Sequence, residues 1–321
     1  MKKSFVVAFL LFASFPAQSE QMRFLVFGDW GMGNEQQKAV AKQMKTTAAS
    51  QEVQFVVNVG DNFYKTTVDS KGNREGGITN LTDSLWQTYF EQVYNSTLKN
   101  LTFYSILGNH DYMGNASAQL LYHKLDSRWV MPDRNYTVRF SLNNDTGSTA
   151  LFVFIDTSPF IGSYYTDPEN PTMKQQLDQQ NYKEQLTWLN ETLRASKDEW
   201  KFVVGHHPIY SAYGVFLPGD ISVSMEVVKP VLQDNGVAAY FCGHVHKLQH
   251  LQQDGIDFFI SGAGATGKVY VEDPNMIESV VWSTKDAGFM TVELDDDQMV
   301  SQFINTEGTV IHSATTKRPT I

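Results

Sequence analysis

The chain has 321 residues, of which 42% are apolar and 19% are charged, and its formal net charge is −10. This composition is typical of a globular protein with a packed core, and it excludes an intrinsically disordered chain. The acidic balance and the scattered lysines and arginines argue against a nucleic-acid-binding protein, which would carry a basic stripe.

The first residues have the pattern of an export signal. Lys2 and Lys3 precede an apolar run over residues 5–15, and Ala17 and Ser19 supply the small residues that a signal peptidase reads. The run is shorter than the ~20 residues that a membrane span needs. We therefore predict a signal peptide over residues 1–19 and a periplasmic or secreted, extracellular protein, with a buried N-terminal helix as the alternative.

Apolar runs and helical patterns alternate along the first half of the chain. We predict strands over residues 24–27, 55–59 and 103–107, and helices over residues 35–48 and 83–94. Each predicted strand is followed by glycine and then by aspartate or asparagine. This repetition predicts an α/β sheet with covering helices and with ligand groups at the carboxyl ends of its strands.

The second half repeats this alternation with shorter units. We predict strands over residues 150–155, 201–204 and 237–241, and helices over residues 182–193 and 223–232, with Pro230 as a candidate for a bend. The tail over residues 258–312 alternates in polarity and predicts antiparallel strands. Residues 158–181 contain three prolines and predict a long loop, either beside the site or disordered.

Cys242, the only cysteine, excludes an intrachain disulfide and is expected to be buried. No linker interrupts the sequence, so we predict a single catalytic domain over residues 20–321.

Five short strings at predicted strand ends carry the chemistry: GDWG (28–31), GDNFY (60–64), GNHD (108–111), GHHP (205–208) and GHVH (243–246). A lone Gly-Asp pair is most often a turn. Two such pairs, together with Asn109 and three histidines on similar strand ends, supply enough ligands for two metal ions.

The histidines divide into candidate ligands and ordinary residues. In an extended GHVH, His244 and His246 lie at i and i+2 and face one side of the strand. His206 is the third candidate, and we expect its neighbour His207 to face away from the metals. Hydrogen-bonded core or surface positions are expected for the remaining candidates, His123, His250 and His312.

The set of motifs resembles the metallophosphoesterase superfamily, the calcineurin-like phosphoesterases. Most members have Asp-X-His in the first motif, whereas this chain has Asp29-Trp30-Gly31 and offers Tyr64 three residues after Asp61. Gly-Asp-X-Gly with Gly-Asp-X-X-Tyr is typical of purple acid phosphatases. The strings at 108–119, 239–252 and 261–265 resemble the small mammalian type, and the likeness covers nearly the whole mature chain. The resemblance implies a four-layer α/β/β/α sandwich, in which two mixed β-sheets pack face to face with helices on both outer faces.

The resemblance also implies a ligand set. The first metal would be held by Asp29, Asp61, Tyr64 and His246, and the second by Asp61, Asn109, His206 and His244, with Asp61 bridging. A trivalent ion overcomes the pKa of ~10 of a phenol, so we expect Fe(III) beside Tyr64. The second pocket suits a divalent ion: Fe(II), Zn or Mn. The alternative for Tyr64 is a hydroxyl that does not bind the metal.

The implied activity is that of an acid phosphatase, with a hydroxide supplied by the metals attacking the phosphorus of a monoester in line. His110 would protonate the leaving group or steady the phosphate, and Asp111 would orient His110. The family's second active-site histidine is missing from residues 209–216, which leaves His110 alone or with Tyr213. The expected substrates are small phosphate esters, phosphoproteins or nucleotides, and we expect a monomer with no nucleic-acid or membrane partner.

Three alternatives belong to other classes. The same site could hydrolyse phosphodiesters or nucleotide pyrophosphates, and an Fe(III)/Fe(II) pair could act as a peroxidase. A non-catalytic protein stabilised by metals is the third, and the complete ligand set argues against it.

Overall fold

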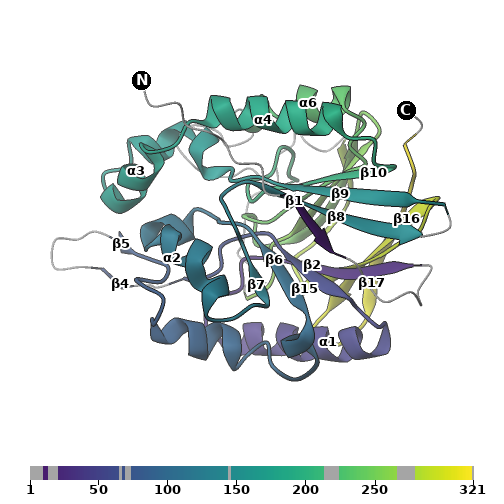
Figure 1. The fold of residues 1–321 in the computed structure, drawn as a ribbon. Helices are drawn as coiled ribbons and strands as arrows, with labels where there is room; N and C mark the ends of the chain where they lie inside the picture. The colour runs from purple at the N-terminus through teal and green to yellow at the C-terminus, as the bar shows by residue number, and fades with distance from the viewer. Residues whose placement is uncertain are drawn as a thin grey trace.

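The computed structural model describes residues 10–13, 21–64, 67–68, 74–143, 146–212, 224–265 and 279–319. Within these ranges, two mixed β-sheets pack face to face (Figure 1). The eight-stranded sheet contains, in spatial order, β1 (Leu10–Ala13), β8 (Tyr136–Asn143), β9 (Ser148–Phe154), β10 (Trp200–Val204), β11 (Ala239–Cys242), β13 (Ile256–Ser261), β12 (Leu248–Gln253) and β14 (Val280–Thr284). The seven-stranded sheet contains β17 (Val310–Lys317), β16 (Gln298–Asn305), β15 (Gly288–Leu294), β2 (Met22–Phe27), β3 (Phe55–Asn58), β6 (Thr102–Ser105) and β7 (Trp129–Val130). A separate pair is formed by β4 (Thr67–Val68) and β5 (Arg74–Glu75).

Helices cover the outer faces of both sheets. In Figure 1, α1 (Glu35–Ser50) lies below the sheets, and α4 (Tyr182–Ala195) and α6 (Lys229–Asp234) lie above them. The side chain of Asn34 caps α1 by accepting the N–H of Gln37, and Asn181 caps α4 in the same way. The predicted α/β/β/α sandwich of two mixed sheets is therefore confirmed.

Aromatic side chains hold the two sheets together. The ring of Phe24 on β2 lies 5.4 Å from that of Phe152 on β9 and 6.1 Å from that of Phe241 on β11. Phe55 on β3 stacks on Phe140 of β8 with centroids 4.5 Å apart. All five side chains are buried, and burial of each stabilises the fold by about 1.5–3 kcal/mol. This interior fixes the position of the two sheets, and with it the position of the strand ends.

Most of the predicted elements are confirmed. The six predicted strands correspond to β2, β3, β6, β9, β10 and β11, and two predicted helices correspond to α1 and α4. The helix predicted over residues 83–94 contains the π-helical segment η1 (Trp86–Glu91), followed along the chain by the 3₁₀ segment η2 (Ser96–Asn100). Cys242 is buried at the end of β11, as expected.

Three expectations need correction. Pro230 is the second residue of α6 and does not bend it, because a first-turn residue needs no N–H partner. The helix predicted over residues 223–232 is instead interrupted by a turn at residues 226–228, and residue 223 lies outside the described ranges. In the tail, β13 pairs parallel with β11, whereas β14, β15, β16 and β17 pair antiparallel with their neighbours. Residues 158–181 are not a plain loop: they form η5 (Ser158–Phe160), η6 (Gly162–Tyr165) and α3 (Pro171–Leu177).

The N-terminal prediction stays a prediction. Most of residues 1–19 and the catalytic candidate Tyr213 lie outside the described ranges. Within the expected signal, the backbone of β1 pairs parallel with β8 at the edge of its sheet. Among the described helices, each is too short or too polar to cross a bilayer.

Candidate metal centre

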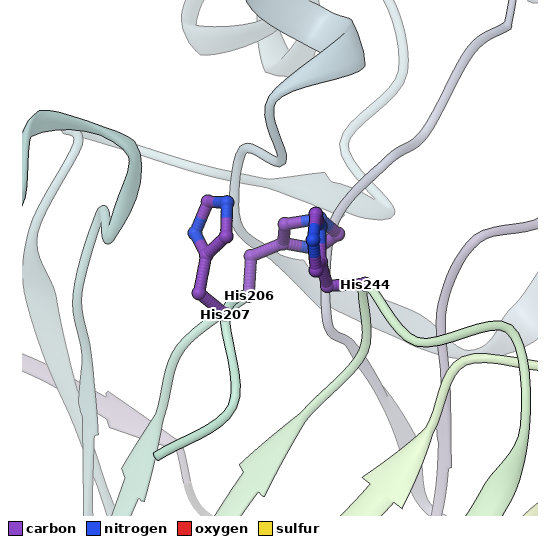
Figure 2. Close-up of side chains that lie close together, drawn as sticks. All are labelled: His206, His207 and His244. Atoms are coloured by element: carbon purple, nitrogen blue, oxygen red, sulfur yellow. The ribbon is translucent and has the colours of Figure 1, made fainter. Parts of the chain in front are cut away.

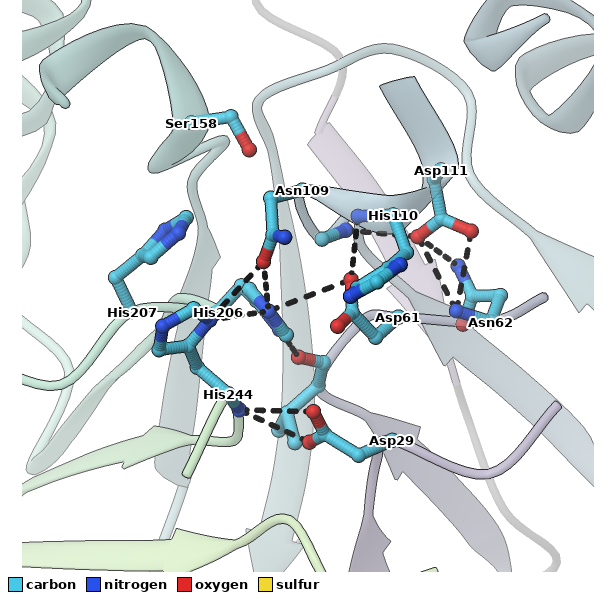
Figure 3. Close-up of polar contacts among 12 residues, drawn as sticks. Asp29, Asp61, Asn62, Asn109, His110, Asp111, Ser158, His206, His207 and His244 are labelled. Atoms are coloured by element: carbon cyan, nitrogen blue, oxygen red, sulfur yellow. Dashed lines mark hydrogen bonds and ion pairs between the residues drawn. The ribbon is translucent and has the colours of Figure 1, made fainter. Parts of the chain in front are cut away.

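The carboxyl ends of strands from both sheets meet at one place, shown in Figure 3. In the seven-stranded sheet, β2, β3 and β6 are parallel neighbours, so the turns that carry Asp29, Asp61 and Asn109 come together. In the eight-stranded sheet, β10 and β11 are parallel neighbours and lead to His206 and His244. All five side chains enter the same space between the sheets, because parallel strands end at the same edge.

A first cluster surrounds the phenol of Tyr64. Its hydroxyl lies 3.1 Å from Oδ1 of Asp29, 2.8 Å from Oδ2 of Asp61 and 3.1 Å from Nε2 of His246. All four side chains are buried. One phenolic proton faces two carboxylate oxygens and, in the tautomer with the proton on Nδ1, the lone pair of His246; a cation would satisfy all four groups at once.

A second cluster surrounds the amide of Asn109. Its Oδ1 lies 3.2 Å from Nε2 of His206 and 3.0 Å from Nδ1 of His244, and those two nitrogens are 3.3 Å apart. Nδ1 of His206 lies 2.8 Å from the carbonyl oxygen of Val59 and donates to it, so Nε2 of the neutral ring offers a lone pair. When Nε2 of His206 and Nδ1 of His244 carry no proton, three lone pairs converge at this point, which is the arrangement that a cation requires.

Asp61 faces both clusters. Its Oδ2 accepts from Tyr64, and its Oδ1 lies 3.5 Å from Nε2 of His206. The Asp61 carboxylate therefore connects the two clusters, with one oxygen toward each.

The charges of the clusters shift the pKa values of their members. Burial, followed by the charges of Asp29 and Asp61, raises the pKa of Tyr64 well above its usual value. Burial alone would lower the pKa of His206, but the Asp61 carboxylate raises it to about 9. Burial and the neighbouring His206 hold the pKa of His244 well below its usual value. A phenolate at position 64 therefore needs a strong positive charge beside it, and His244 offers a neutral imidazole.

Three of the six described non-glycine residues with a positive φ lie in these clusters, and the other three, Glu52, Ser96 and Asp254, lie elsewhere. Asp29, Asp61 and His244 have φ angles of 58°, 51° and 67°, in the left-handed region that residues with a side chain avoid. Each follows a glycine in the sequence, and the predicted extended conformation of GHVH is wrong, because His244 is left-handed and residues 244–247 form bends. Such strain costs on the order of 1–3 kcal/mol per residue and persists mainly at functional sites.

Gly31 lets the tyrosine-bearing turn approach the first motif. A Cβ atom at position 31 would lie 1.8 Å from the carbonyl oxygen of Asn62. The N–H of Tyr64 also donates to the carbonyl of Gly31 at 2.8 Å. A histidine at position 31 cannot fit in this geometry, and the same close approach places Tyr64 in the first cluster.

The two predicted catalytic residues lie in different surroundings. His110 is partly exposed, its N–H donates to Oδ1 of Asp61 at 2.8 Å, and its ring lies 4.4 Å from that of Tyr64. Asp111 is buried, and its carboxylate accepts hydrogen bonds from the N–H groups of Asn62, Phe63 and Gly108 and from the side chains of Asn62 and Gln119. Asp111 therefore joins the turns that carry Asp61 and Asn109, and an orienting contact with the His110 imidazole stays a prediction.

His207 lies closer to the site than the sequence led us to expect. Its ring centroid lies 4.9 Å from that of His206 and 4.6 Å from that of His244 (Figure 2). Oγ1 of Thr157 accepts the N–H groups of His206 and His207, so the hydroxyl proton goes to Nδ1 of His207, 2.7 Å away. Nε2 then donates to the hydroxyl of Tyr164 at 2.9 Å. His206, His207 and His244 bring ring nitrogens within 4.8 Å of one another, close enough to hold one ion. Both ring nitrogens of His207 already have hydrogen-bond partners, so we assign it a supporting role, and no sequence pattern marked this contact.

The other histidines have hydrogen-bond partners away from the two clusters. His250 lies 3.0 Å from His312 and 2.9 Å from Asp257, between the two sheets, and His123 lies 2.9 Å from the carbonyl of Leu120.

Comparison with known proteins places this geometry in a family. The model of the calcineurin-like phosphoesterases matches residues 22–248. Tartrate-resistant acid phosphatase type 5 of Mus musculus is 31% identical, with 91% of this chain and 89% of the relative covered. Purple acid phosphatase 3 of Arabidopsis thaliana is 34% identical over 90% of this chain and 76% of its own.

Solved structures agree on the fold. The Plasmodium protein described as "GAP50 the anchor in the inner membrane complex" superposes with a TM-score of 0.75 at 24% identity, covering 94% of this chain and 90% of its own. Purple acid phosphatase PPD1 from yellow lupin gives 0.66 at 17% identity, covering 94% and 54%. The chain thus belongs to the calcineurin-like phosphoesterase family and, within it, to the purple acid phosphatases, phosphatases whose shared motifs imply a binuclear metal centre.

Proposed function

We propose that this acid phosphatase hydrolyses phosphate monoesters at an Fe(III)–M(II) centre, where M is Fe, Zn or Mn. The observation that carries the proposal is the buried phenol of Tyr64, which faces both carboxylates and His246 within 3.1 Å. Hard, anionic oxygen ligands favour a trivalent ion, and Asn109, His206 and His244 form a neutral pocket that favours a divalent one.

The residues present fit these two ions. Fe(III) would be held by Asp29, Asp61, Tyr64 and His246, and the divalent ion by Asp61, Asn109, His206 and His244. The support is the convergence of acceptor atoms around Tyr64 and around Asn109, at distances of 2.8–3.3 Å. When bound, the two ions supply a hydroxide nucleophile at acid pH and positive charge for the phosphate.

The chain itself orients the substrate and moves the proton. Burial of the ligand side chains excludes water and strengthens the electrostatic contacts in the site. His110 stands at the partly exposed side of the clusters, where its imidazole protonates the departing alkoxide. Asp111 keeps the Asp61 and Asn109 turns in place through its bonds to residues 62, 63 and 108.

A kinetic comparison with metal analysis tests the proposal. We expect the purified protein to contain two metal ions per chain, at least one of them iron, and to hydrolyse a phosphate monoester faster than the matching diester at acid pH. Faster hydrolysis of the diester or of a nucleotide pyrophosphate would replace the monoesterase assignment by one of those activities. A protein with both metals and no hydrolysis of any of the three would contradict the proposed function.

A further inference from the structure

The segment between β9 and α4 contacts two separate parts of the site. We define it as the strap, residues 156–180, which includes η5, η6 and α3. At its start, Thr157 accepts the N–H of His206 at 3.2 Å, and the hydroxyl of Tyr164 lies 2.9 Å from His207. The strap is therefore anchored to the turn that carries a ligand of the second cluster.

The far end of the strap holds the turn that carries His110. Nε2 of Gln176 on α3 donates to the carbonyls of Tyr112 and Gly114, both at 2.9 Å, and its Oε1 accepts the N–H of Ala116 at 3.1 Å. Tyr112 belongs to η3 (His110–Met113), and Ala116 begins α2 (Ala116–Leu121). Figure 1 shows α3 directly above α2. One side chain thus binds both sides of the bend between η3 and α2.

A second set of bonds joins the same two segments. The hydroxyl of Tyr112 accepts from Gln180 at 2.7 Å and from Arg134 at 2.6 Å, and it donates to Asp156 at the start of the strap. Tyr112 and Asp156 are both buried. The strap therefore closes a continuous path of contacts from the His206 turn to the His110 turn.

We propose that Gln176 is a positioning residue that sets the place of the His110 imidazole relative to the metal ligands. The inference rests on the proposed function, in which His110 protonates the leaving group. A 3₁₀ turn of four residues has little rigidity of its own, and Gly114 directly follows η3. The amide of Gln176 fixes both carbonyls at that end. The bond of the His110 N–H to Asp61 and the bonds of Asp111 fix the other end, so the direction of His110 depends on Gln176 together with them.

The test compares two substrates that differ in their need for a proton. A nitrophenolate leaves without being protonated, whereas an alkoxide must be protonated as it leaves. In the metal-loaded Gln176→Met variant, which keeps the side-chain volume, we expect kcat for an alkyl phosphate to fall about 10- to 100-fold and kcat for nitrophenyl phosphate to fall less than about threefold. Metal content, the visible spectrum and KM for nitrophenyl phosphate should be unchanged. Gln175→Ala, at an exposed position on the same helix, should match the wild type with both substrates.

Two further results separate the possible failures. His110→Ala should show the same substrate asymmetry in a stronger form, with the metals retained. If His110→Ala shows it and Gln176→Met does not, the positioning role of Gln176 is wrong and the proposed function stands. If His110→Ala slows both substrates equally, the proton-donating role of His110 fails first. If Gln176→Met does not fold, Gln180→Ala tests the strap by removing the hydrogen bond from Gln180 to the Tyr112 hydroxyl. An equal fall in kcat for both substrates in that variant overturns the inference.

Discussion

Gly31 and Tyr64 act as a pair because the backbone of one passes close to that of the other. The carbonyl of Gly31 accepts the N–H of Tyr64, and Asn62 leaves no room for a side chain at position 31. Compared with the Asp-X-His motif of most of the superfamily, the sequence has Gly31 in place of the histidine and offers the phenol of Tyr64. The structure adds that the first residue is glycine for steric reasons and that the second reaches both carboxylates.

Substitution of Gly31 tests this steric account. In Gly31→Ala, the turn at residues 62–64 must move away, which costs about 1–3 kcal/mol and withdraws Tyr64 from the first cluster. We expect a lower free energy of unfolding in urea, together with loss of bound iron. Gly162→Ala is the matched control, because a Cβ there meets no atom within 4 Å. Equal stability and iron content in the two variants would refute the account.

Among the structural elements, the turns that follow β3 and β6 are connected by Asp111. Its carboxylate accepts N–H groups from both the residue 62–63 turn and Gly108. Burial and the charge of Asp61 raise its pKa to about 7 even so. Its effect on the chemistry is thus exerted through the backbone that carries the ligands.

Replacement of the Asp111 carboxylate should weaken metal binding rather than act directly on turnover. In Asp111→Asn, an NH₂ group replaces one of the two carboxylate oxygens that accept these N–H groups. An NH₂ group cannot accept a hydrogen bond, and each N–H left unpaired costs about 1–3 kcal/mol. We expect a lower melting temperature and weaker retention of both metals, measured by metal analysis after dialysis. A variant that keeps its metals and stability but loses turnover would instead support the predicted orientation of His110 by Asp111.

The strands and the strap differ in how well the sequence predicts them. Five of the six predicted strands lead to Gly-Asp, Gly-Asn or Gly-His after a continuous apolar run, which made them predictable, and β9 was predictable from its apolar run alone. The strap was not, because prolines favour loops as well as helix starts: Pro159 is the second residue of η5, and Pro171 is the first residue of α3. The left-handed conformation at Asp29 and the contact between His207 and His244 depend on strands that are distant in sequence, so no local pattern reveals them.

At the scale of the whole molecule, the site closes only when the two sheets come together. Each cluster takes side chains from both sheets, so binding of the metals is linked to packing of the aromatic interior. The protein is thereby expected to gain stability from its metals. Cleavage after residue 19 and a monomeric state remain predictions, which N-terminal sequencing of the exported protein and its sedimentation would check.

The stability of the metal-free protein should depend on pH through His206. Its pKa is about 9 in the folded chain, against an ordinary value of 6.5. The folded state therefore holds a proton that the unfolded state releases, so this stabilisation is complete below pH 6.5 and is lost as the pH rises to about 9. The loss amounts to about 3 kcal/mol. Urea unfolding across this range should show the decline, and His206→Asn should remove it; a parallel decline in the variant would assign it to other groups.

The most direct test of the central claim is the visible absorption spectrum of the metal-loaded protein beside that of Tyr64→Phe. The account predicts a tyrosinate-to-iron(III) charge-transfer band in the wild type, and its loss in a variant that keeps the fold. An active wild-type enzyme that contains only zinc or manganese and has no such band would contradict the assignment of iron to the Tyr64 site.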